Sequence, residues 1–359
     1  MALRILFLSD SHLGLDLPSR PRVERRRRGD DLFESFERAL EPVTRGDVKV
    51  VVHGGDLFYR SRIPAWLAER VFARLAELGR AGVDVFWVPG NHERGSVPRG
   101  LLLTHPAIRV FDRPRTFVVR RDGLAVALAG FPYAPRVRED FPALLAATGH
   151  AEIEADVKLL CLHQAVEGAT VGPAGYVFRT GEEVLRGRDV PPGFAAVLSG
   201  HIHRAQVLTR DLHGRPLASP VLFAGSTDRT SFAERFEPKG SFLLDALPDG
   251  RPGGAVTWAF RELPVRPMVV VDLDPATDGL ETRLGKALAG LEPGSVVRLR
   301  LLSDPPPAAL PCLRAAALRA AAPPGTTLSV AWPSLRIARP ARRAAPEDPS
   351  PARPHAPRP

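Results

Sequence analysis

Side chains that can bind metal ions follow five apolar stretches of the sequence, close to where each stretch ends. These side chains are Asp10, His12, Asp56, Asn91, His92, His163, His201 and His203. Imidazole and carboxylate ligands together suit manganese, iron or zinc, and a carboxylate that bridges two ions holds them ~3.5–4 Å apart. Each of these residues alone is more often an ordinary core or turn residue. Because five of the ten histidines share the pattern, we instead expect a two-metal site.

The chemistry best served by such a site is hydrolysis of a phosphate ester. A phosphodiester is anionic and repels nucleophiles, whereas two cations neutralise its oxygens and lower the pKa of a bound water. An imidazole beside the site can protonate the leaving oxygen. We therefore expect a metal-bound hydroxide to attack the phosphate. His53 lies just before the second of these stretch ends, and we expect at most a supporting contact from it.

Strands and helices alternate in the first hundred residues. Apolar runs predict strands that each end at a metal-binding side chain, over residues 4–8, 50–52, 83–88, 157–162 and 195–200. Helical spacing of apolar residues predicts helices over 30–40 and 63–80, which favours a mostly parallel sheet. Turn sequences predict three hairpins, over 117–131, 207–223 and 241–260. The carboxyl ends of parallel strands are where ligands bind in such sheets.

The 359 residues are enough for two domains, and a new alternation of predicted strands and helices begins near residue 266. Residues 1–266 form the first predicted domain. Residues 267–336 form a small α/β unit, with predicted strands over 268–271, 296–302 and 327–331 and helices over 281–291 and 313–321. Residues 337–359 consist mainly of Pro, Ala and Arg, so we expect a disordered tail.

The formal net charge is +9, and only four of the 49 basic residues are lysines. Arginine binds phosphate with two nitrogens at once, although a genome biased toward arginine codons explains the enrichment equally well. The basic run at residues 20–28 is typical of a solvated loop, and attraction of phosphate is the second interpretation.

No stretch reaches the ~20 apolar residues of a membrane span, and the first residues lack a signal-peptide pattern. We therefore expect a cytoplasmic protein that does not contact a membrane. Cys161 and Cys312 lie in apolar surroundings in different predicted domains, which predicts buried, reduced thiols.

Five short motifs resemble, in order, the sequence blocks of the calcineurin-like metallophosphoesterases. The motifs are Asp10-Ser11-His12, Gly55-Asp56, Gly90-Asn91-His92, His163 and Gly200-His201-Ile202-His203. The resemblance implies an α/β fold with α+β character, in which helices flank a β-sandwich. It implies that one metal is held by Asp10, His12, Asp56 and His203, and the other by Asp56, Asn91, His163 and His201. His92 is then the catalytic imidazole.

Further motifs resemble the SbcD-type DNA repair nucleases within this superfamily. They are Asp10 to Gly14, Gly55 to Phe58, Gly225-Ser226, Arg229 to Glu234 and Lys239-Gly240. The unit after residue 266 resembles the capping domain of these nucleases. The resemblance implies DNA as a partner, an SbcC-type coiled-coil ATPase as a second one, and a homodimer as the assembly.

Two departures from the SbcD-type pattern bear on these implications. Tyr59 stands where archaeal nucleases of this type carry a histidine that orients the DNA phosphate. A Pro/Arg-rich tail replaces the helical segment that attaches related nucleases to the ATPase. We expect Tyr59, Arg60 and Arg229 to contact the substrate.

The sequence thus predicts a DNA-hydrolysing phosphodiesterase of DNA repair, an exonuclease or a single-strand endonuclease or both. Manganese is the expected metal, with iron, zinc and magnesium as alternatives. One alternative function is a metallophosphatase or phosphodiesterase that acts on small phosphoesters. The other is a non-catalytic scaffold that binds DNA or an ATPase.

Overall fold

Four strands from the first 110 residues run parallel within a six-stranded sheet, whose strand order is β16-β15-β1-β2-β3-β4. This computed structural model describes residues 2–16, 26–93 and 106–333. The strands are β1 Leu3–Leu8, β2 Val50–His53, β3 Asp84–Trp87, β4 Ile108–Val110, β15 Gly240–Leu247 and β16 Ala255–Glu262. The predicted β15–β16 hairpin is confirmed, and it joins this sheet by antiparallel pairing of β15 with β1.

A second six-stranded sheet has the order β13-β14-β12-β7-β6-β5. Its strands are β5 Arg115–Arg121, β6 Leu124–Gly130, β7 Val157–Leu162, β12 Ala196–Ser199, β13 Gln206–Arg210 and β14 Pro216–Phe223. The four inner strands are parallel, and the edge strands β5 and β13 pair antiparallel with their neighbours. The other two predicted hairpins are therefore also confirmed.

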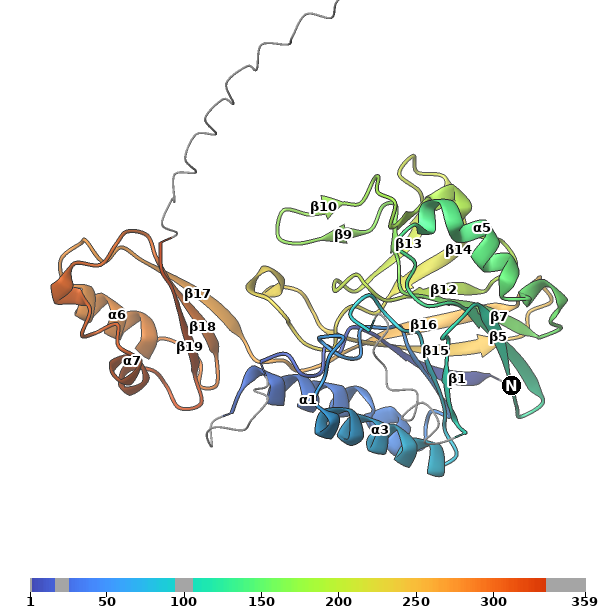
Figure 1. The fold of residues 1–359 in the computed structure, drawn as a ribbon, viewed down its shortest axis with the longest axis horizontal. Helices are drawn as coiled ribbons and strands as arrows, with labels where there is room; N and C mark the ends of the chain where they lie inside the picture. Colours follow the sequence, from blue (N-terminus) through green and yellow to red (C-terminus); the bar gives the residue numbers. More distant parts are fainter. Residues whose placement is uncertain (1, 17–25, 94–105, 334–359) are drawn as a thin grey trace, which may run out of the picture.

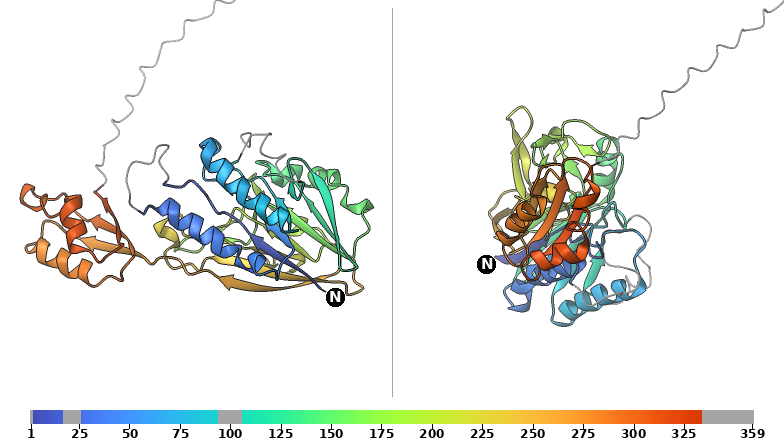
Figure 2. Two further views of the ribbon diagram at one scale, coloured as in Figure 1. Left: turned by 90° about the horizontal axis from the view of Figure 1, so that it is seen from below. Right: turned by 90° about the vertical axis from the view of Figure 1, so that its left-hand side faces the viewer.

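The two sheets pack face to face, and helices cover their outer faces (Figures 1 and 2). Successive side chains of a strand point to opposite faces, so Ile5 and Phe7 enter the core between the sheets while Leu6 and Leu8 face the helices. The helices are α1 Arg28–Ala39, α2 Glu41–Thr44, α3 Ala65–Arg80 and α5 Val137–Ala147. The predicted fold class, a β-sandwich flanked by helices, is confirmed.

Short strands pair outside the two large sheets. They are β8 Ala165–Val166 with β11 Val184–Leu185, and β9 Thr170–Val171 with β10 Tyr176–Val177. Residues of β8 and β11 pack with α5 on the outer face of the second sheet. The sequence pattern predicted neither these strands nor α5.

A three-stranded parallel sheet with two helices lies at one end of the molecule (Figure 2). Its elements are β17 Met268–Leu273, α6 Leu280–Ala289, β18 Val296–Leu301, α7 Ala315–Ala321 and β19 Thr327–Ala331. Its leucine-rich core is its own, which supports our proposal that a second domain begins near residue 267; that this domain is a capping domain rests on the resemblance. The predicted tail, residues 337–359, lies outside the described residues.

Arg266 joins this small unit to the rest of the protein. Its guanidinium donates to Asp31 on α1 at 2.8 Å, and to the carbonyl oxygen of Gly325 at 2.8 Å and the Thr327 hydroxyl at 3.0 Å in the small unit. Asp31 is buried and also accepts a hydrogen bond from Arg28 at 2.6 Å. One arginine at the predicted domain boundary therefore contacts both parts.

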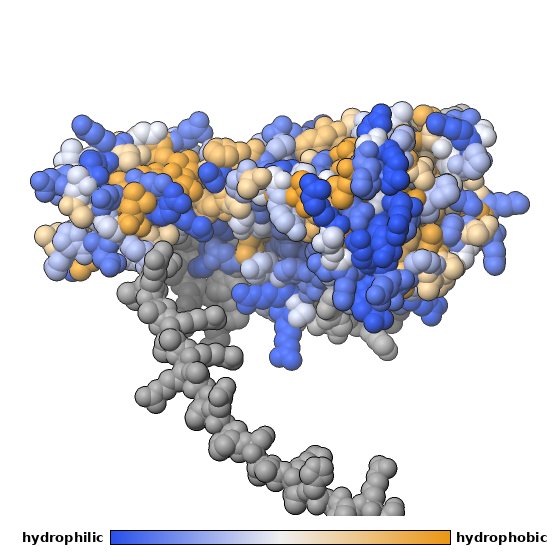
Figure 3. Space-filling view, turned by 90° about the horizontal axis from the view of Figure 1, so that it is seen from above, coloured by the Kyte–Doolittle hydropathy of each residue, from blue (hydrophilic) through white to orange (hydrophobic). Residues whose placement is uncertain are grey.

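Apolar side chains gather on one face of the small unit (Figure 3). Leu302, Leu310 and Trp332 are its exposed large hydrophobic residues within the described range.

Cys161 is buried and Cys312 half-buried, and both are free thiols. None of the described helices is both long enough and apolar enough to cross a membrane.

Candidate metal centre

The ends of strands from both sheets meet at one edge of the sandwich. Asp10 follows β1, Asp56 follows β2, and His163 and His201 follow β7 and β12 of the second sheet. Backbone hydrogen bonds tie the first two loops together, because the amide of Asp10 donates to the carbonyl oxygen of Gly55 at 2.9 Å. The chain thus brings together candidate metal ligands that are far apart in sequence.

The backbone at this edge is held in a conformation that side chains rarely adopt. Positive φ angles occur at Asp10 (52°), His12 (45°), Asp56 (48°) and His201 (77°). Six non-glycine residues in the described part have positive φ, so most of them lie in this one cluster. Such strain costs of order 1–3 kcal/mol per residue and concentrates at functional sites. Here it turns the side chains toward one another.

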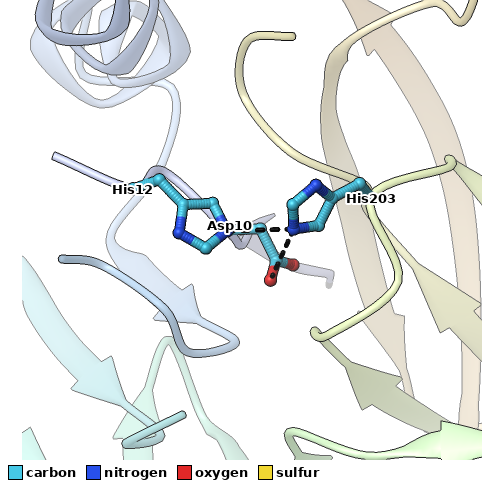
Figure 4. Close-up of side chains that lie close together, drawn as sticks. All are labelled: Asp10, His12 and His203. Carbon is cyan, nitrogen blue, oxygen red and sulfur yellow. Dashed lines mark hydrogen bonds and ion pairs between the residues drawn. The ribbon is translucent and has the colours of Figure 1, made fainter. Parts of the chain in front are cut away.

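His12, His203 and Asp10 form the first group of metal-binding atoms (Figure 4). The Nε2 atoms of His12 and His203 lie 2.9 Å apart, and Nε2 of His203 lies 3.9 Å from Oδ1 of Asp10. Burial and the neighbouring His203 hold the pKa of His12 well below its ordinary value. His12 is therefore neutral and offers a lone pair to a cation.

Asn91, His163 and His201 form the second group, together with Asp56. Oδ1 of Asn91 lies 3.1 Å from Nε2 of His163 and 3.0 Å from Nδ1 of His201. Nδ1 of His163 lies 2.7 Å from the carbonyl oxygen of Gly54. A carbonyl can only accept, so Nδ1 carries a proton, and in the neutral ring Nε2 holds the lone pair that a metal ion would bind.

Asp56 lies between the two groups. Its Oδ2 atom is 3.9 Å from Nε2 of His12 and 3.4 Å from Nε2 of His163. Burial opposes ionisation of Asp56, but the neighbouring imidazoles hold the pKa of this carboxyl below its ordinary value. Likewise, burial disfavours the charged form of His163, but the Asp56 carboxylate raises the pKa of His163 to about 9. Asp56 is therefore ionised, and its negative charge stabilises a cation beside it.

These atoms fit two divalent metal ions. Three groups of three described residues place metal-binding atoms within 4.8 Å of one another, and Asp56 belongs to two of these groups. A buried set of carboxylates, imidazoles and one amide is the donor chemistry that manganese, iron and zinc share.

His92 lies at the rim of the site and is half-buried. Its Nδ1 atom is 2.5 Å from the carbonyl oxygen of Tyr59, so Nδ1 donates and Nε2 is the free atom. Nε2 lies 3.8 Å from Oδ2 of Asp56. His92 also forms one of the three groups with His12 and Asp56, so this geometry alone would also allow a ligand role.

The sequence pattern gave Glu93 no role, although this residue directly follows His92. Its buried carboxylate accepts backbone hydrogen bonds from Gly90 at 2.7 Å, Phe58 at 2.8 Å and Asp56 at 3.1 Å. It therefore fixes the loop after β3 to the loop after β2. Burial raises the pKa of Glu93 to about 8.

His53 supports the loop after β1. The amide of Gly55 donates to Nδ1 of His53 at 3.3 Å, so Nδ1 is the acceptor and Nε2 carries the ring proton. Nε2 donates that proton to the hydroxyl oxygen of Ser11 at 3.0 Å. Burial lowers the pKa of His53 to about 3, so the ring is neutral. Gly55 itself has a φ of +106°, and a Cβ there would lie 2.2 Å from Nδ1 of His163.

Tyr59 and Arg60 lie beside the metal-binding residues. The Tyr59 ring is 5.8 Å from the His92 ring, and the guanidinium carbon of Arg60 is 5.5 Å from the centre of the Tyr59 ring. Together with Arg62 they line a pocket of ≈ 430 Å³. Neither Arg60 nor Arg62 pairs with a described carboxylate, and both are exposed.

Arg229 has a different environment from the other two residues expected to contact substrate. Its terminal nitrogens donate to the carbonyl oxygens of Arg266 at 3.0 Å and Glu237 at 3.3 Å. These hydrogen bonds would have to break before Arg229 could contact a substrate.

The predicted basic loop lies mostly outside the described residues, at 17–25.

Comparisons with known proteins give the following matches. The family model described as calcineurin-like phosphoesterase matches residues 3–205. The DNA double-strand break repair protein Mre11 of Haloferax volcanii is 31% identical over 77% of this chain and 56% of its own length. Its counterpart from Methanopyrus kandleri is 27% identical, over 73% and 57%. The chain therefore spans less than two thirds of the length of these relatives.

Among solved structures, a hypothetical protein from Thermus thermophilus matches with 17% identity and a TM-score of 0.42. This match covers 73% of the chain and all of the Thermus protein. A likeness at this level supports no argument about function.

Proposed function

The chain belongs to the calcineurin-like phosphoesterase family, whose members use divalent metals, and from this premise we propose that it hydrolyses DNA phosphodiesters with two metal ions. The observation that carries the proposal is the position of Asp56, whose Oδ2 faces His12 on one side and His163 on the other. One carboxylate oxygen between two groups of ligands suits a bridging role.

We take the ligands of the two ions from the family resemblance, and the proximity of Asp10, His12 and His203 supports the first set. Asp10, His12, Asp56 and His203 would hold one ion, and Asp56, Asn91, His163 and His201 the other. Manganese is the metal that we propose, because it suits the carboxylate and amide oxygens of the set, and iron, zinc and magnesium are the alternatives. When bound, such ions neutralise phosphate oxygens and lower the pKa of a water near them.

His92 is the residue that we propose as the catalytic acid. The Tyr59 carbonyl oxygen holds its Nδ1 atom, so Nε2 faces the position that the scissile phosphate would take beside Asp56. When the ring carries a second proton, on Nε2, that proton can pass to the leaving oxygen and leave the neutral Nδ1–H ring. His92 is half-buried whereas His163 is fully buried, and this partial exposure suits a group that must contact substrate.

DNA is the proposed substrate for two reasons. The relatives that match most of this chain are named as DNA double-strand break repair proteins. In addition, Arg60 and Arg62 line a pocket next to the proposed site without a described carboxylate partner. Free guanidinium groups beside a phosphate site can hold the neighbouring phosphates of a polynucleotide, which a small phosphoester lacks.

The proposal is tested with labelled hairpin, single-stranded and blunt-ended DNA in Mn²⁺, in Mg²⁺ and in a chelator. We expect cleavage in Mn²⁺ that the chelator abolishes, and the three substrates separate exonuclease from single-strand endonuclease activity. Asp56→Asn is the matched inactive variant. Hydrolysis of nitrophenyl phosphoesters with none of DNA would instead favour a small-molecule phosphoesterase.

The partner assignments are also proposals. An SbcC-type coiled-coil ATPase and a homodimer follow only from the likeness to SbcD-type nucleases. The exposed hydrophobic residues of the small unit, Leu302, Leu310 and Trp332, are available to a protein partner. Light scattering of the purified chain tests the homodimer, and copurification with an ATPase encoded next to it tests the second partner.

A further inference from the structure

Lys239 is a fully buried lysine close to the proposed metal site. Its side chain has 0% exposure, and its Nζ atom lies 2.7 Å from Oε2 of Glu234 and 3.3 Å from Oε2 of Glu237. The third Nζ proton goes to the backbone carbonyl oxygen of His203 at 2.9 Å. All three donors of the ammonium group are therefore paired.

Glu234 connects this lysine to the ring of His203. Its Oε2 atom faces Lys239, and its Oε1 atom lies 3.2 Å from Nδ1 of His203. The hydroxyl of Thr230 is 2.6 Å from the same Oε1 atom and 3.2 Å from Nδ1 of His203. The carboxylate thus contacts the lysine with one oxygen and the histidine with the other.

The hydrogen bonds determine which nitrogen of His203 carries its proton. The Thr230 hydroxyl has one hydrogen, and its shortest contact is to Oε1 of Glu234, which can only accept. The same hydrogen cannot also serve Nδ1 of His203. Nδ1 must therefore be the donor to Glu234 and Thr230, which leaves Nε2 unprotonated in the neutral ring and directed at His12 and Asp10.

We infer that Glu234 and Lys239 position His203 as a metal ligand, by fixing its tautomer through the side chain and its place through the backbone. The inference rests on the proposed function, because it concerns the ion that His203 would bind. A carboxylate that accepts the second N–H of a ligating histidine orients the ring and raises its affinity for metal. Lys239 holds that carboxylate by its other oxygen.

A purely structural role explains this arrangement less well. Buried ion pairs are weak contributors to stability, because desolvation offsets much of their attraction. Lys239 also has a second carboxylate partner, Glu237, whose side chain accepts a hydrogen bond from Arg204 at 3.0 Å rather than from the His203 ring. Glu237 therefore provides a matched control within the same network.

The test compares Glu234→Gln with Glu237→Gln by Mn²⁺ titration under electron paramagnetic resonance. The side chain of a glutamine at position 234 has one oxygen and one NH₂ group. Its oxygen can face only one of the two donors, Lys239 and Nδ1–H of His203, and the other donor then faces the NH₂ group. We expect one of the two Mn²⁺ sites to weaken by about 10- to 100-fold, while the other site is unchanged. Glu237→Gln should bind both ions like the wild type.

Three results would overturn the inference. Equal Mn²⁺ binding by Glu234→Gln and the wild type would remove the role of Glu234. Equal weakening by Glu237→Gln would show a general effect of the buried network. Wild-type protein that binds no Mn²⁺ would overturn the proposed function as well, so the two failures can be distinguished.

A second readout does not depend on whether Glu234→Gln folds. Nitrogen NMR of metal-free wild-type protein labelled with ¹⁵N-histidine, under alkaline conditions and assigned with His203→Gln, should show His203 protonated at Nδ1. A neutral His203 protonated at Nε2 would contradict the inference.

Discussion

Replacing Gly90 with alanine should displace Asp56, the carboxylate that we propose to bridge the two ions. A Cβ atom at position 90 would lie 2.2 Å from Oδ1 and 2.6 Å from the backbone nitrogen of Asp56. Ordinary carbon contacts begin at about 3.5 Å, so the carboxylate or the loop must move by about 1 Å. A shift of this size in a catalytic group costs about 100-fold in rate.

The assay for Gly90→Ala is DNA hydrolysis in Mn²⁺, together with a Mn²⁺ titration and a thermal melt. We expect about 100-fold slower cleavage and weaker metal binding in a protein that still folds. Gly285→Ala is the matched control, because a Cβ there meets nothing within 4 Å and an alanine stabilises a helix by about 1 kcal/mol relative to glycine. If Gly90→Ala bound Mn²⁺ and cleaved DNA as well as the wild type does, the reasoning would be refuted.

Three further predictions concern the residues around Asp56. His92→Ala should lower the cleavage rate by about 10²- to 10⁴-fold and leave Mn²⁺ affinity within a few-fold of wild type; a large loss of Mn²⁺ binding would instead make His92 a ligand. Arg60→Ala and Arg62→Ala should each reduce the salt slope of DNA affinity by about 1, and unchanged slopes would show that neither arginine contacts phosphate. Burial disfavours the charged form of His163, but Asp56 raises the pKa of His163 to about 9. At neutral pH the ring therefore carries two protons, and a metal ion that binds His163 must displace one of them. Calorimetry should therefore show Mn²⁺ affinity rising about tenfold per pH unit between about 7 and 9, and a flat profile would contradict this proton balance.

The sequence predicted the elements whose signals are local. The apolar runs that end at Asp10, Asp56 and His163 became strands of the two sheets, because an apolar run bounded by polar residues fits a buried strand. Helix α5 was not predicted, since Pro142 interrupts its pattern and only Val137 and Phe141 are buried. A proline within a helix normally ends or bends it.

Contacts between distant residues could not be predicted in the same way. The β15–β16 hairpin was expected from its own turn, but its pairing with β1 depends on which sheet edge is free. The ion pair between Glu234 and Lys239 and its contact with His203 likewise join separate segments. Only the resemblance to SbcD-type nucleases marked Glu234 and Lys239, and it assigned them no role.

The most direct test of the central claim is a crystal of the protein soaked in Mn²⁺, with diffraction recorded on both sides of the manganese absorption edge. We predict two anomalous peaks about 3.5–4 Å apart, with the Asp56 carboxylate between them. His12 and His203 should border one peak, and His163 and Asn91 the other. A single peak, or two peaks that do not share Asp56, would contradict the account.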